Sequence, residues 1–327
     1  MKNVLVTGGN GFIGSNIAEA LLEEGYHVRV LRRRESDTRA LEGLEVETVF
    51  GDIRDAESVM NAVKGCDTVF HTAAVISYWK PERPVMEAVN VGGTRNVVDA
   101  CLRASVQKLI HTSSIEAIGF PGHGQIANES TAFNWQSFDI GYRNTKWAAE
   151  QEIARGVRYG LDAVMVNPSV VIGPRDIHFH GGQLIRDIYH KRIFYYVRGG
   201  MSVVYVGDVV QGHILAAMKG RTGERYILSG SSLSHKEIIT TIAEVVGGIK
   251  PLFRVPSPAV TALASLSELT ARILKRKPWV TCELLAGSRF RYSFSTAKAE
   301  TELGCSFAPF REAVQKTFDW YKEKGLL

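Results

Sequence analysis

The chain has 327 residues, which suits one large α/β domain or one such domain carrying a smaller lobe. Its hydrophobic fraction of 45% and charged fraction of 22% are those of an ordinary globular protein and exclude a disordered or collagen-like chain. The formal net charge of +5 is too small to indicate a nucleic-acid partner, and no apolar run approaches the roughly 18 residues that predict a membrane span.

Short apolar strands alternate with helical patterns in the first half of the chain. Strands are predicted over residues 4–6, 28–31, 46–50, 68–71, 108–112 and 163–166, and helices over residues 12–24, 85–103 and 142–159. Such alternation implies right-handed crossovers and a parallel sheet that is covered on both faces. We therefore predict an α/β fold built on a Rossmann-type, doubly wound parallel sheet.

A glycine-rich turn, GGNGFIG over residues 8–14, lies between the first strand and the first helix. Its glycines allow a sharp turn and a close approach of backbone N–H groups to a pyrophosphate, and the helix N-terminus adds a positive dipole end. The alternative is a tight turn without a ligand. The spacing G-x-x-G-x-x-G resembles the fingerprint of short-chain dehydrogenases/reductases, particularly the extended branch. The residues predicted to bind a dinucleotide here are Gly8, Asn10, Gly11, Phe12, Ile13 and Gly14.

Three arginines, Arg32, Arg33 and Arg34, follow the second strand, and no carboxylate appears before Glu35. An acidic residue at this place would accept hydrogen bonds from the ribose 2′-OH of NAD, whereas guanidinium groups pair with a 2′-phosphate. The run therefore favours NADP(H) over NAD(H), with Arg32 and Arg33 as cofactor ligands. NAD(H) stays an alternative, because an arginine-rich run is also typical of a solvated loop.

Two segments after the third and fourth strands resemble other cofactor contacts of the extended short-chain enzymes. The resemblance implies that Asp52 contacts the adenine and that Ile53 lies against its ring, although an aspartate here could equally cap a helix. Small residues after the fourth strand let the backbone lie along the ribose and phosphates. These residues are Thr72, Ala73 and Ala74.

The spacing Y-x-x-x-K, formed by Tyr142 and Lys146, begins a predicted helix and places both side chains on one helical face. A tyrosine has a pKa of roughly 10 in water, and a nearby ammonium together with an oxidised nicotinamide is expected to lower that pKa. We predict that Tyr142 exchanges a proton with the substrate oxygen. Lys146 is expected to act on Tyr142 and to hold the nicotinamide ribose, so both residues also contact the cofactor.

The fifth predicted strand ends in Thr112, Ser113 and Ser114, at the sheet edge where ligands bind in open parallel sheets. The resemblance places the catalytic serine at Ser114, whose hydroxyl would stabilise charge on the substrate oxygen, and it leaves Thr112 and Ser113 to the cofactor or backbone. It also implies that Asn90 supports the site from behind. Beside the nicotinamide, the resemblance implies the cofactor contacts Pro168, Ser169 and Val171.

The regular alternation of strands and helices ends after residue 168, where pairs of glycines separate shorter segments. Further strands are predicted over residues 203–206 and 226–228, and a terminal helix over 310–324. We expect residues 1–170 to form the dinucleotide-binding domain, to which the chain returns around residues 203–228. Residues 171–327 are expected to form a smaller, mixed α/β substrate-binding lobe.

Within the extended branch, the segments VFHTAA (69–74), TSS (112–114) and GERYIL (223–228) resemble dihydroflavonol-4-reductase-like proteins and 3β-hydroxysteroid dehydrogenases. The function implied is an NADP(H)-dependent enzyme that moves hydride between nicotinamide and a ketone, aldehyde or secondary alcohol. One alternative is an NAD-dependent nucleotide-sugar epimerase or dehydratase, and another is a non-catalytic dinucleotide sensor. Epimerases of this kind often carry a diphosphate-binding arginine just before the strand at 203–206, where this chain has the sequence GGMS. Other arginines that could substitute are Arg175, Arg186 and Arg198.

The expected partners are a small-molecule carbonyl or alcohol substrate and a second copy of the chain, with no metal, nucleic acid or membrane span. The helices at 85–103 and 142–159 resemble those that pair across dimers of this group, so a homodimer is expected. The apolar stretch 259–274 and its basic tail 275–277 could touch a membrane surface, but packing in the core of the small lobe is favoured. His178 and His180 have no third ligand nearby, which argues against a metal site. Four cysteines without CxxC spacing indicate reduced thiols and a cytoplasmic protein: Cys66, Cys101, Cys282 and Cys305.

Overall fold

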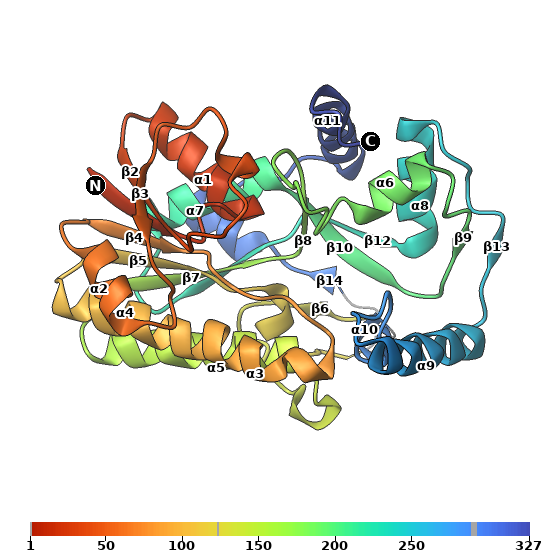
Figure 1. Ribbon diagram of the computed structural model, residues 1–327, viewed down its shortest axis with the longest axis horizontal. Coiled ribbons are helices and arrows are strands. Elements are labelled where there is room, and N and C mark those ends of the chain that lie inside the picture. The colour runs from red at the N-terminus through yellow and green to blue at the C-terminus, as the bar shows by residue number, and fades with distance from the viewer. Residues whose placement is uncertain (1, 123, 289–292) are drawn as a thin grey trace.

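The computed structural model describes residues 2–122, 124–288 and 293–327. Its centre is a seven-stranded sheet in the order β11-β7-β5-β4-β1-β2-β3, and every neighbouring pair is parallel (Figure 1). The order reverses on either side of β1, which defines a doubly wound sheet with a switch point beside that strand. The strands are β1 (Asn3–Thr7), β2 (His27–Arg32), β3 (Glu47–Phe50), β4 (Thr68–His71), β5 (Lys108–Thr112), β7 (Ala163–Pro168) and β11 (Arg225–Leu228).

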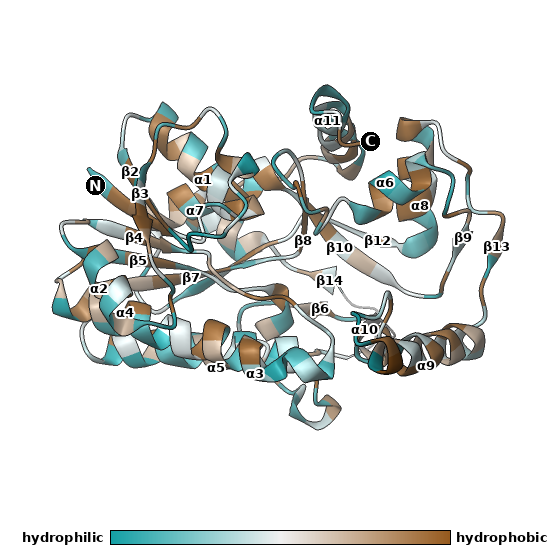
Figure 2. Cartoon of the chain, in the orientation of Figure 1, coloured by the Kyte–Doolittle hydropathy of each residue, from teal (hydrophilic) through white to brown (hydrophobic). Residues whose placement is uncertain are grey.

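Helices cover both faces of this sheet because alternate strand residues are apolar on both sides. Val4 and Val6 of β1 belong to the core beneath α1 (Phe12–Glu23) and α7 (Val206–Lys219). Leu5 points the other way, into the core beneath α2 (Ala56–Val63), α4 (Gly93–Arg103) and α5 (Gly141–Arg158). Figure 2 shows the central strands as the most hydrophobic part of this half. A short helix α3 (Arg83–Met86) and a π-helical segment (Glu87–Gly92) lead directly into α4.

A smaller lobe is built mainly from the second half of the chain. Its mixed sheet contains β8 (Val170–Ile172), β10 (Gly200–Tyr205) and β12 (Ser231–Ser234), in which β12 runs antiparallel to β10. This sheet shares one hydrophobic core with α6 (Gln183–Tyr189), α8 (His235–Val246) and α11 (Phe310–Glu323). The outer elements are α9 (Ser257–Leu274), α10 (Cys282–Ser288) and two strand pairs, β9 (Tyr195–Tyr196) with β13 (Phe253–Arg254) and β6 (Ile126–Ala127) with β14 (Ser293–Phe294). Single 3-10 turns occur at Arg39–Leu41, Lys80–Glu82, Ile115–Ala117 and Gln136–Phe138, and a second π-helical segment at Ala299–Leu303.

The predicted fold class is confirmed by this arrangement. The strand predicted over 226–228 is β11 at the edge of the central sheet, whereas the strand predicted over 203–206 overlaps β10 and pairs within the small sheet. The preference for core packing of 259–274 is wrong. Helix α9 turns Leu266 and Ile273 outward, and it buries only the small residues Ala264, Ser267 and Ala271. Within the described residues, no helix is both long and apolar enough to cross a membrane.

Candidate active site

The glycine turn packs so tightly on the loop after β4 that no side chain would fit at Gly8 or Gly14. Gly8 has a φ of +67°, and a Cβ on it would lie 2.8 Å from the Cα of Ala73. A Cβ on Gly14 would lie 2.7 Å from Thr72 Oγ1. Helix α1 begins after Gly11 without any side-chain cap, so the amide groups of its first turn stay available. This cradle fits the pyrophosphate of a dinucleotide.

The arginine run lies beside this turn, at the carboxyl ends of β2 and β3. The guanidinium groups of Arg32 and Arg34 stand 4.7 Å and 4.5 Å from the ring centroid of the half-exposed Phe50. None of the arginines 32–34 forms an ion pair with a carboxylate in the described part of the chain. Asn10 links the glycine turn to the loop that follows the arginine run, since its side-chain amide donates to the carbonyl of Asp37 at 3.2 Å.

Asp52 and Ile53 follow β3 at the same edge. The carboxylate of Asp52 is bonded to Arg54 at 2.6 Å, and this hydrogen bond lowers the pKa of Asp52. The alternative role of Asp52 as a helix cap is not observed, because Asp55 caps α2 by accepting from the Glu57 amide at 3.0 Å. Ile53 is buried between the sheet and α4.

The loop after β4 is tied to α5 by Asn90, which lies in the π-helical segment. The Asn90 side chain accepts from the amide of Val75 at 2.8 Å and donates to the Val75 carbonyl at 2.9 Å. It also donates to Thr145 Oγ1 at 3.1 Å. At the start of this loop, Thr72 Oγ1 donates to the Thr7 carbonyl at 2.7 Å. These bonds hold residues 72–75 between the glycine turn and α5.

Tyr142 and Lys146 lie one turn apart at the start of α5, and both are buried. Burial raises the pKa of Tyr142, while a hydrogen bond with the Ser114 side chain opposes that rise. Burial lowers the pKa of Lys146 to about 8, and the charge of Glu150 opposes that fall. The Lys146 ammonium donates to the Thr112 carbonyl at 2.8 Å. The expected lowering of the Tyr142 pKa is therefore not seen in the protein without a dinucleotide, because desolvation of the phenolate dominates.

The three hydroxyl residues after β5 differ in their partners. Ser113 Oγ donates to Glu150 at 2.6 Å, and Thr112 Oγ1 lies 2.8 Å from His213 Nε2. Of the three, only the Ser114 hydroxyl acts on the Tyr142 phenol, whose pKa it lowers, and it also accepts from the Glu116 amide at 3.2 Å. The structure thus brings Ser114, Tyr142 and Lys146 together at the carboxyl edge of the sheet.

The segment that follows β7 borders the same edge. Asn167 donates to the Ser114 carbonyl at 2.9 Å and to Glu150 at 2.7 Å, which fixes the strand end behind the serine. Pro168 ends β7, and Ser169 is buried with its hydroxyl unpaired among the described residues. Val171 lies in β8, half-buried.

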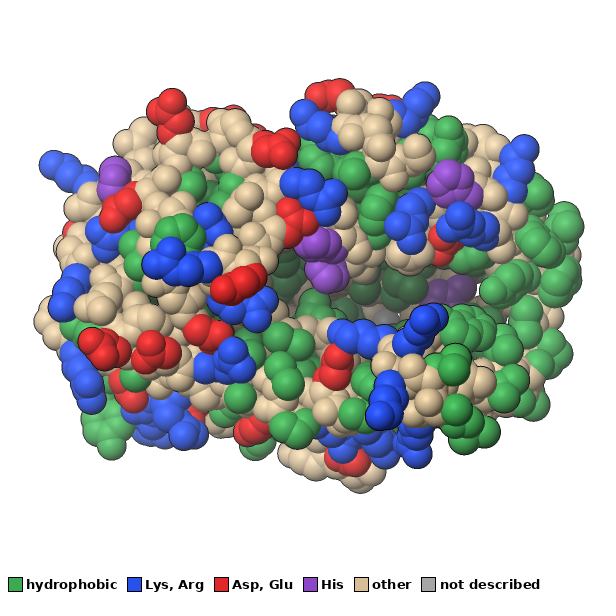
Figure 3. Space-filling view, in the orientation of Figure 1, with side chains coloured by type: hydrophobic (Ala, Val, Ile, Leu, Met, Phe, Trp, Pro, Cys, Tyr) green, Lys and Arg blue, Asp and Glu red, His purple; other side chains and the backbone are tan. Residues whose placement is uncertain are grey.

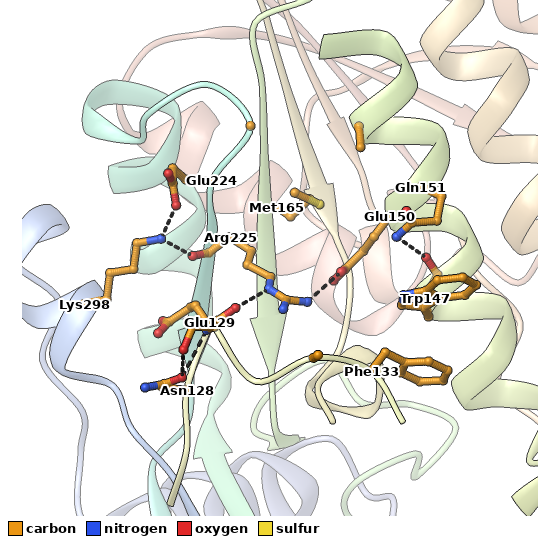
Figure 4. A pocket seen from close by; sticks show the side chains of 14 residues that line it. Asn128, Glu129, Phe133, Trp147, Glu150, Gln151, Met165, Glu224, Arg225 and Lys298 are labelled. Atoms are coloured by element: carbon orange, nitrogen blue, oxygen red, sulfur yellow. Dashed lines mark hydrogen bonds and ion pairs between the residues drawn. The ribbon is translucent and has the colours of Figure 1, made fainter. Parts of the chain in front are cut away.

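Glu150 was not anticipated, although it lies on the same face of α5 as Tyr142 and Lys146, one turn beyond the lysine. Its second carboxylate oxygen pairs with Arg225 at 3.2 Å (Figure 4). Figure 4 shows this pair in a pocket of about 750 Å³ between α5 and the start of β11. Arg225 is the first residue of β11, so the pocket lies at the opposite end of the sheet from the carboxyl edge. The role of Arg225 in this pocket is to hold the Glu150 carboxylate in place.

A second unanticipated carboxylate, that of Glu283 in α10, reaches the N-terminus of α5. It accepts from the Gly141 amide at 2.5 Å and from Arg83 at 3.0 Å. Because an anion at a helix N-terminus is stabilised by the helix dipole, Glu283 anchors the residue that precedes Tyr142. Sequence spacing gave no signal for this contact, since 142 residues separate its partners.

The rings of His178 and His180 lie edge to face, with their centroids 5.8 Å apart. His178 Nε2 lies 3.7 Å from Asp37, and the described residues contain no group of three side chains that could hold a metal ion.

Residues 5–230 match the model of the 3-beta hydroxysteroid dehydrogenase/isomerase family. The chain belongs to this family. This confirms the resemblance to the extended short-chain dehydrogenases/reductases and assigns the chain to a family of oxidoreductases and epimerases.

Known relatives of this 3-beta hydroxysteroid dehydrogenase/isomerase family member cover almost its whole length. It is 34% identical to a dihydroflavonol 4-reductase-like protein of Synechocystis sp., over 98% of this chain and 94% of that protein. It is 33% identical to sterol demethylase protein B of Methylococcus capsulatus, over 99% of both chains. The UDP-glucose 4-epimerase of Thermus thermophilus, solved in complex with NAD, superposes with a TM-score of 0.78 at 27% identity, covering 98% of this chain and 99% of that one. The family thus binds a nicotinamide dinucleotide.

Proposed function

We propose that this protein is an NADP(H)-dependent oxidoreductase that interconverts a ketone or aldehyde and the corresponding alcohol. The observation that carries the proposal is the grouping of three buried side chains, Ser114, Tyr142 and Lys146, at the carboxyl edge of the sheet, where the Thr112 carbonyl accepts from the Lys146 ammonium at 2.8 Å. A bound nicotinamide would supply or accept the hydride. The protein's own residues then have to bind the substrate oxygen and move one proton.

Tyr142 is the proton donor for carbonyl reduction and the acceptor for alcohol oxidation. Its raised pKa keeps the phenol protonated in the protein alone, as reduction requires. Ser114 donates a hydrogen bond to the same substrate oxygen and stabilises the charge that develops there. Lys146, held by the Thr112 carbonyl, places a positive charge one turn below the phenol and favours its deprotonation when the positively charged, oxidised nicotinamide is present.

The preference for NADP(H) is supported by Arg32 and Arg33. These arginines lie at the end of β2 and directly after it, and neither forms an ion pair within the described residues, so a 2′-phosphate could pair with their guanidinium groups. The pyrophosphate would lie on the amides of the glycine turn and the adenine near Asp52 and Ile53. In the remaining contacts, Thr72, Ala73 and Ala74 would line the ribose and phosphates, and Pro168, Ser169 and Val171 the nicotinamide.

A substrate without a nucleotide diphosphate is favoured because two of the three candidate arginines are engaged within the protein. Arg175 is engaged by the Ala40 carbonyl at 2.7 Å and by Glu19, and Arg186 lies over the Phe179 ring at 4.2 Å. The Tyr78 ring packs edge-on against Tyr142 with the centroids 5.8 Å apart. Figure 3 shows a hollow between the α9–α10 region and the lobe that carries α6 and α8, with hydrophobic side chains inside it. An apolar carbonyl compound fits these surroundings.

Stoichiometric consumption of NADPH tests this function. Purified protein would be given a panel of apolar ketones and aldehydes and, in parallel, nucleotide sugars, and the absorbance of NADPH followed. We expect oxidation of NADPH in proportion to alcohol formed. Conversion of a nucleotide sugar without net change of cofactor would identify an epimerase instead, and cofactor binding without any turnover would identify a sensor.

A homodimer through α4 and α5 and a cytoplasmic location complete the proposal. The two helices pack side by side and are linked by ion pairs, Arg95 with Glu152 at 2.7 Å and Arg155 with Asp99 at 2.7 Å, which make one continuous surface. All four cysteines are free thiols, which supports a reducing compartment. Sedimentation velocity of the purified chain measures the oligomeric state, and a monomer at all concentrations would contradict the dimer.

A further inference from the structure

An ion pair joins the turn that follows Ser114 to the residue that follows Tyr142. The Arg143 guanidinium donates to the Glu116 carboxylate through Nε and, at 3.4 Å, through Nη2. The side chain of Arg143 is only 6% exposed and that of Glu116 is 21% exposed. Because apolar side chains in place of a buried ion pair often cost no stability, the pair at this position is poorly explained by stability alone.

The turn after Ser114 is fixed at both of its ends. At its start, Ser114 Oγ accepts from the Glu116 amide at 3.2 Å. At its end, the indole of the fully buried Trp135 donates to the Ile118 carbonyl at 2.9 Å. The Arg143 guanidinium stacks on the same indole, 4.0 Å from the ring centroid. Since Ser114 Oγ accepts from the turn, its O–H is left to donate to a substrate oxygen.

The ion pair also places a negative charge near the Tyr142 phenol. Burial raises the pKa of Tyr142, and the Glu116 charge raises it further. Burial and the same charge raise the pKa of Tyr78, whose ring packs edge-on against Tyr142. The Glu116 carboxylate therefore lies within electrostatic reach of both phenols, and Arg143 fixes its position.

We propose that Arg143 and Glu116 are positioning residues for the proton transfer at Tyr142. Their ion pair holds the turn after Ser114 against the start of α5 and keeps one negative charge near the phenol. The Lys146 ammonium favours the ionised phenol and the Glu116 carboxylate opposes it, so the balance of the two charges sets the pH at which Tyr142 exchanges its proton. This inference rests on the role proposed above for Tyr142.

Other charged and titratable groups surround the start of α5. They are Lys146 of α5, Tyr78 in the loop after β4, Arg83 of α3, Asp139 in the preceding turn and Glu283 of α10. In the part of the chain that the structure describes, Glu116 forms an ion pair with Arg143 alone. Removal of the Glu116 charge therefore breaks no other ion pair.

Titration of the Tyr142 phenol with NADP⁺ bound tests the proposal without relying on turnover. Tyrosine that is isotope-labelled at Cζ is followed by NMR, and the Tyr142→Phe variant identifies the Tyr142 resonance. In Glu116→Gln the midpoint should move to lower pH, by about one pH unit, because the opposing charge is gone. In Arg143→Met it should move to higher pH, because no cation then compensates the Glu116 charge. Arg143→Lys should restore the midpoint in part, since an ammonium keeps the charge without the two-armed contact.

The matched control is an arginine–glutamate pair at the opposite edge of the sheet. Arg29 on β2 lies 3.0 Å from Glu47, the first residue of β3. Glu47→Gln and Arg29→Met should leave the Tyr142 midpoint unchanged. The amide in Glu116→Gln still accepts a hydrogen bond from Arg143, so this variant keeps the fold and the test does not depend on the stability of Arg143→Met.

Kinetics separate this inference from the proposed function. With an active carbonyl substrate, Arg143→Met should lower kcat by about 10- to 100-fold and leave the KM for NADPH unchanged, since Ser114 and Tyr142 are no longer held together. If the unmodified protein turns over no carbonyl compound, the proposed function fails, and the titration still decides the role of the ion pair. Equal midpoints in Glu116→Gln and the unmodified protein, or a Tyr142 resonance that titrates in neither, would overturn the proposal. An equal shift in Glu47→Gln would overturn it as well.

Discussion

At the residue scale, the proposed preference for NADP(H) depends on Arg32. Its guanidinium lies beside Phe50 with no carboxylate partner among the described residues, so an added phosphate would gain a charge-assisted bond. We predict that Arg32→Asp lowers kcat/KM for NADPH by about 10- to 100-fold and raises that for NADH. Initial rates with both cofactors measure the ratio. Arg103→Asp, an exposed change at the end of α4, serves as the control, and an unaltered ratio in Arg32→Asp would contradict the assignment.

Glu150 acts on the proton chemistry through Lys146. Its charge opposes the effect of burial, which lowers the pKa of Lys146 to about 8, so its removal should lower that pKa further. Since the ammonium form is the active one, the loss of activity at alkaline pH should begin at lower pH in Glu150→Gln. The pH profile of kcat/KM measures this shift.

The matched control is Glu152→Gln, on the same helix, whose carboxylate pairs with Arg95 and Arg155 away from the site. Loss of the buried Glu150 contacts should also cost about 1–3 kcal/mol of unfolding free energy. A folded Glu150→Gln protein with the pH profile of the unmodified enzyme would exclude this positioning role.

At the scale of elements, three buried histidines should make the stability of the fold depend on pH. Burial lowers the pKa of His71 on β4 to about 3 and that of His213 on α7 to about 4, and it lowers the pKa of His111 on β5. In the unfolded chain each titrates near 6.5, so the unfolded state binds more protons below that pH. Stability should therefore be full above pH 6.5 and decline as the pH falls towards 4, by roughly 2 kcal/mol per histidine at pH 5.

Urea unfolding between pH 7.5 and pH 5 measures this dependence. His213→Gln should reduce the number of protons that the protein takes up on unfolding at pH 5 by about one. Equal pH slopes in the unmodified protein and His213→Gln would show that carboxylates alone cause the acid sensitivity.

The strands and helices of the dinucleotide-binding half could be predicted because apolar runs and helical periodicity are local properties. The sheet assignment of β10 could not, since a short apolar strand does not reveal its pairing partner. The apolar stripe of α9 was visible in the sequence, but its direction was not, because the lobe already has a core of α6, α8 and α11. Hydrophobic periodicity in a sequence identifies the apolar face of a helix, but tertiary packing decides whether that face is buried or exposed.

The same limit applies to the site. The glycine turn and the spacing of Tyr142 and Lys146 could be predicted because each is a short sequence motif whose function depends on local backbone geometry. Glu150 shares their helical face, yet its burial depends on Arg225, 75 residues away. Glu283 depends on a contact 142 residues away and left no local pattern.

At the scale of the whole molecule, the site lies where two units meet. The parallel sheet and its helices supply the glycine turn, Ser114, Asn167 behind the serine, and α5, and the outer part of the second half of the chain adds Glu283 at the start of α5. Glu283 of α10 therefore ties the outer pair of helices, α9 and α10, to the start of α5.

The central claim is that the Tyr142 hydroxyl moves the proton. Tyr142→Phe keeps the ring that packs on Tyr78 and should therefore leave the fold and NADPH binding intact. We predict that kcat for reduction of the best carbonyl substrate falls by about 10²- to 10⁴-fold, while the dissociation constant of NADPH, measured by its fluorescence, stays the same. A Tyr142→Phe protein that binds NADPH and turns over at the unmodified rate would contradict the account.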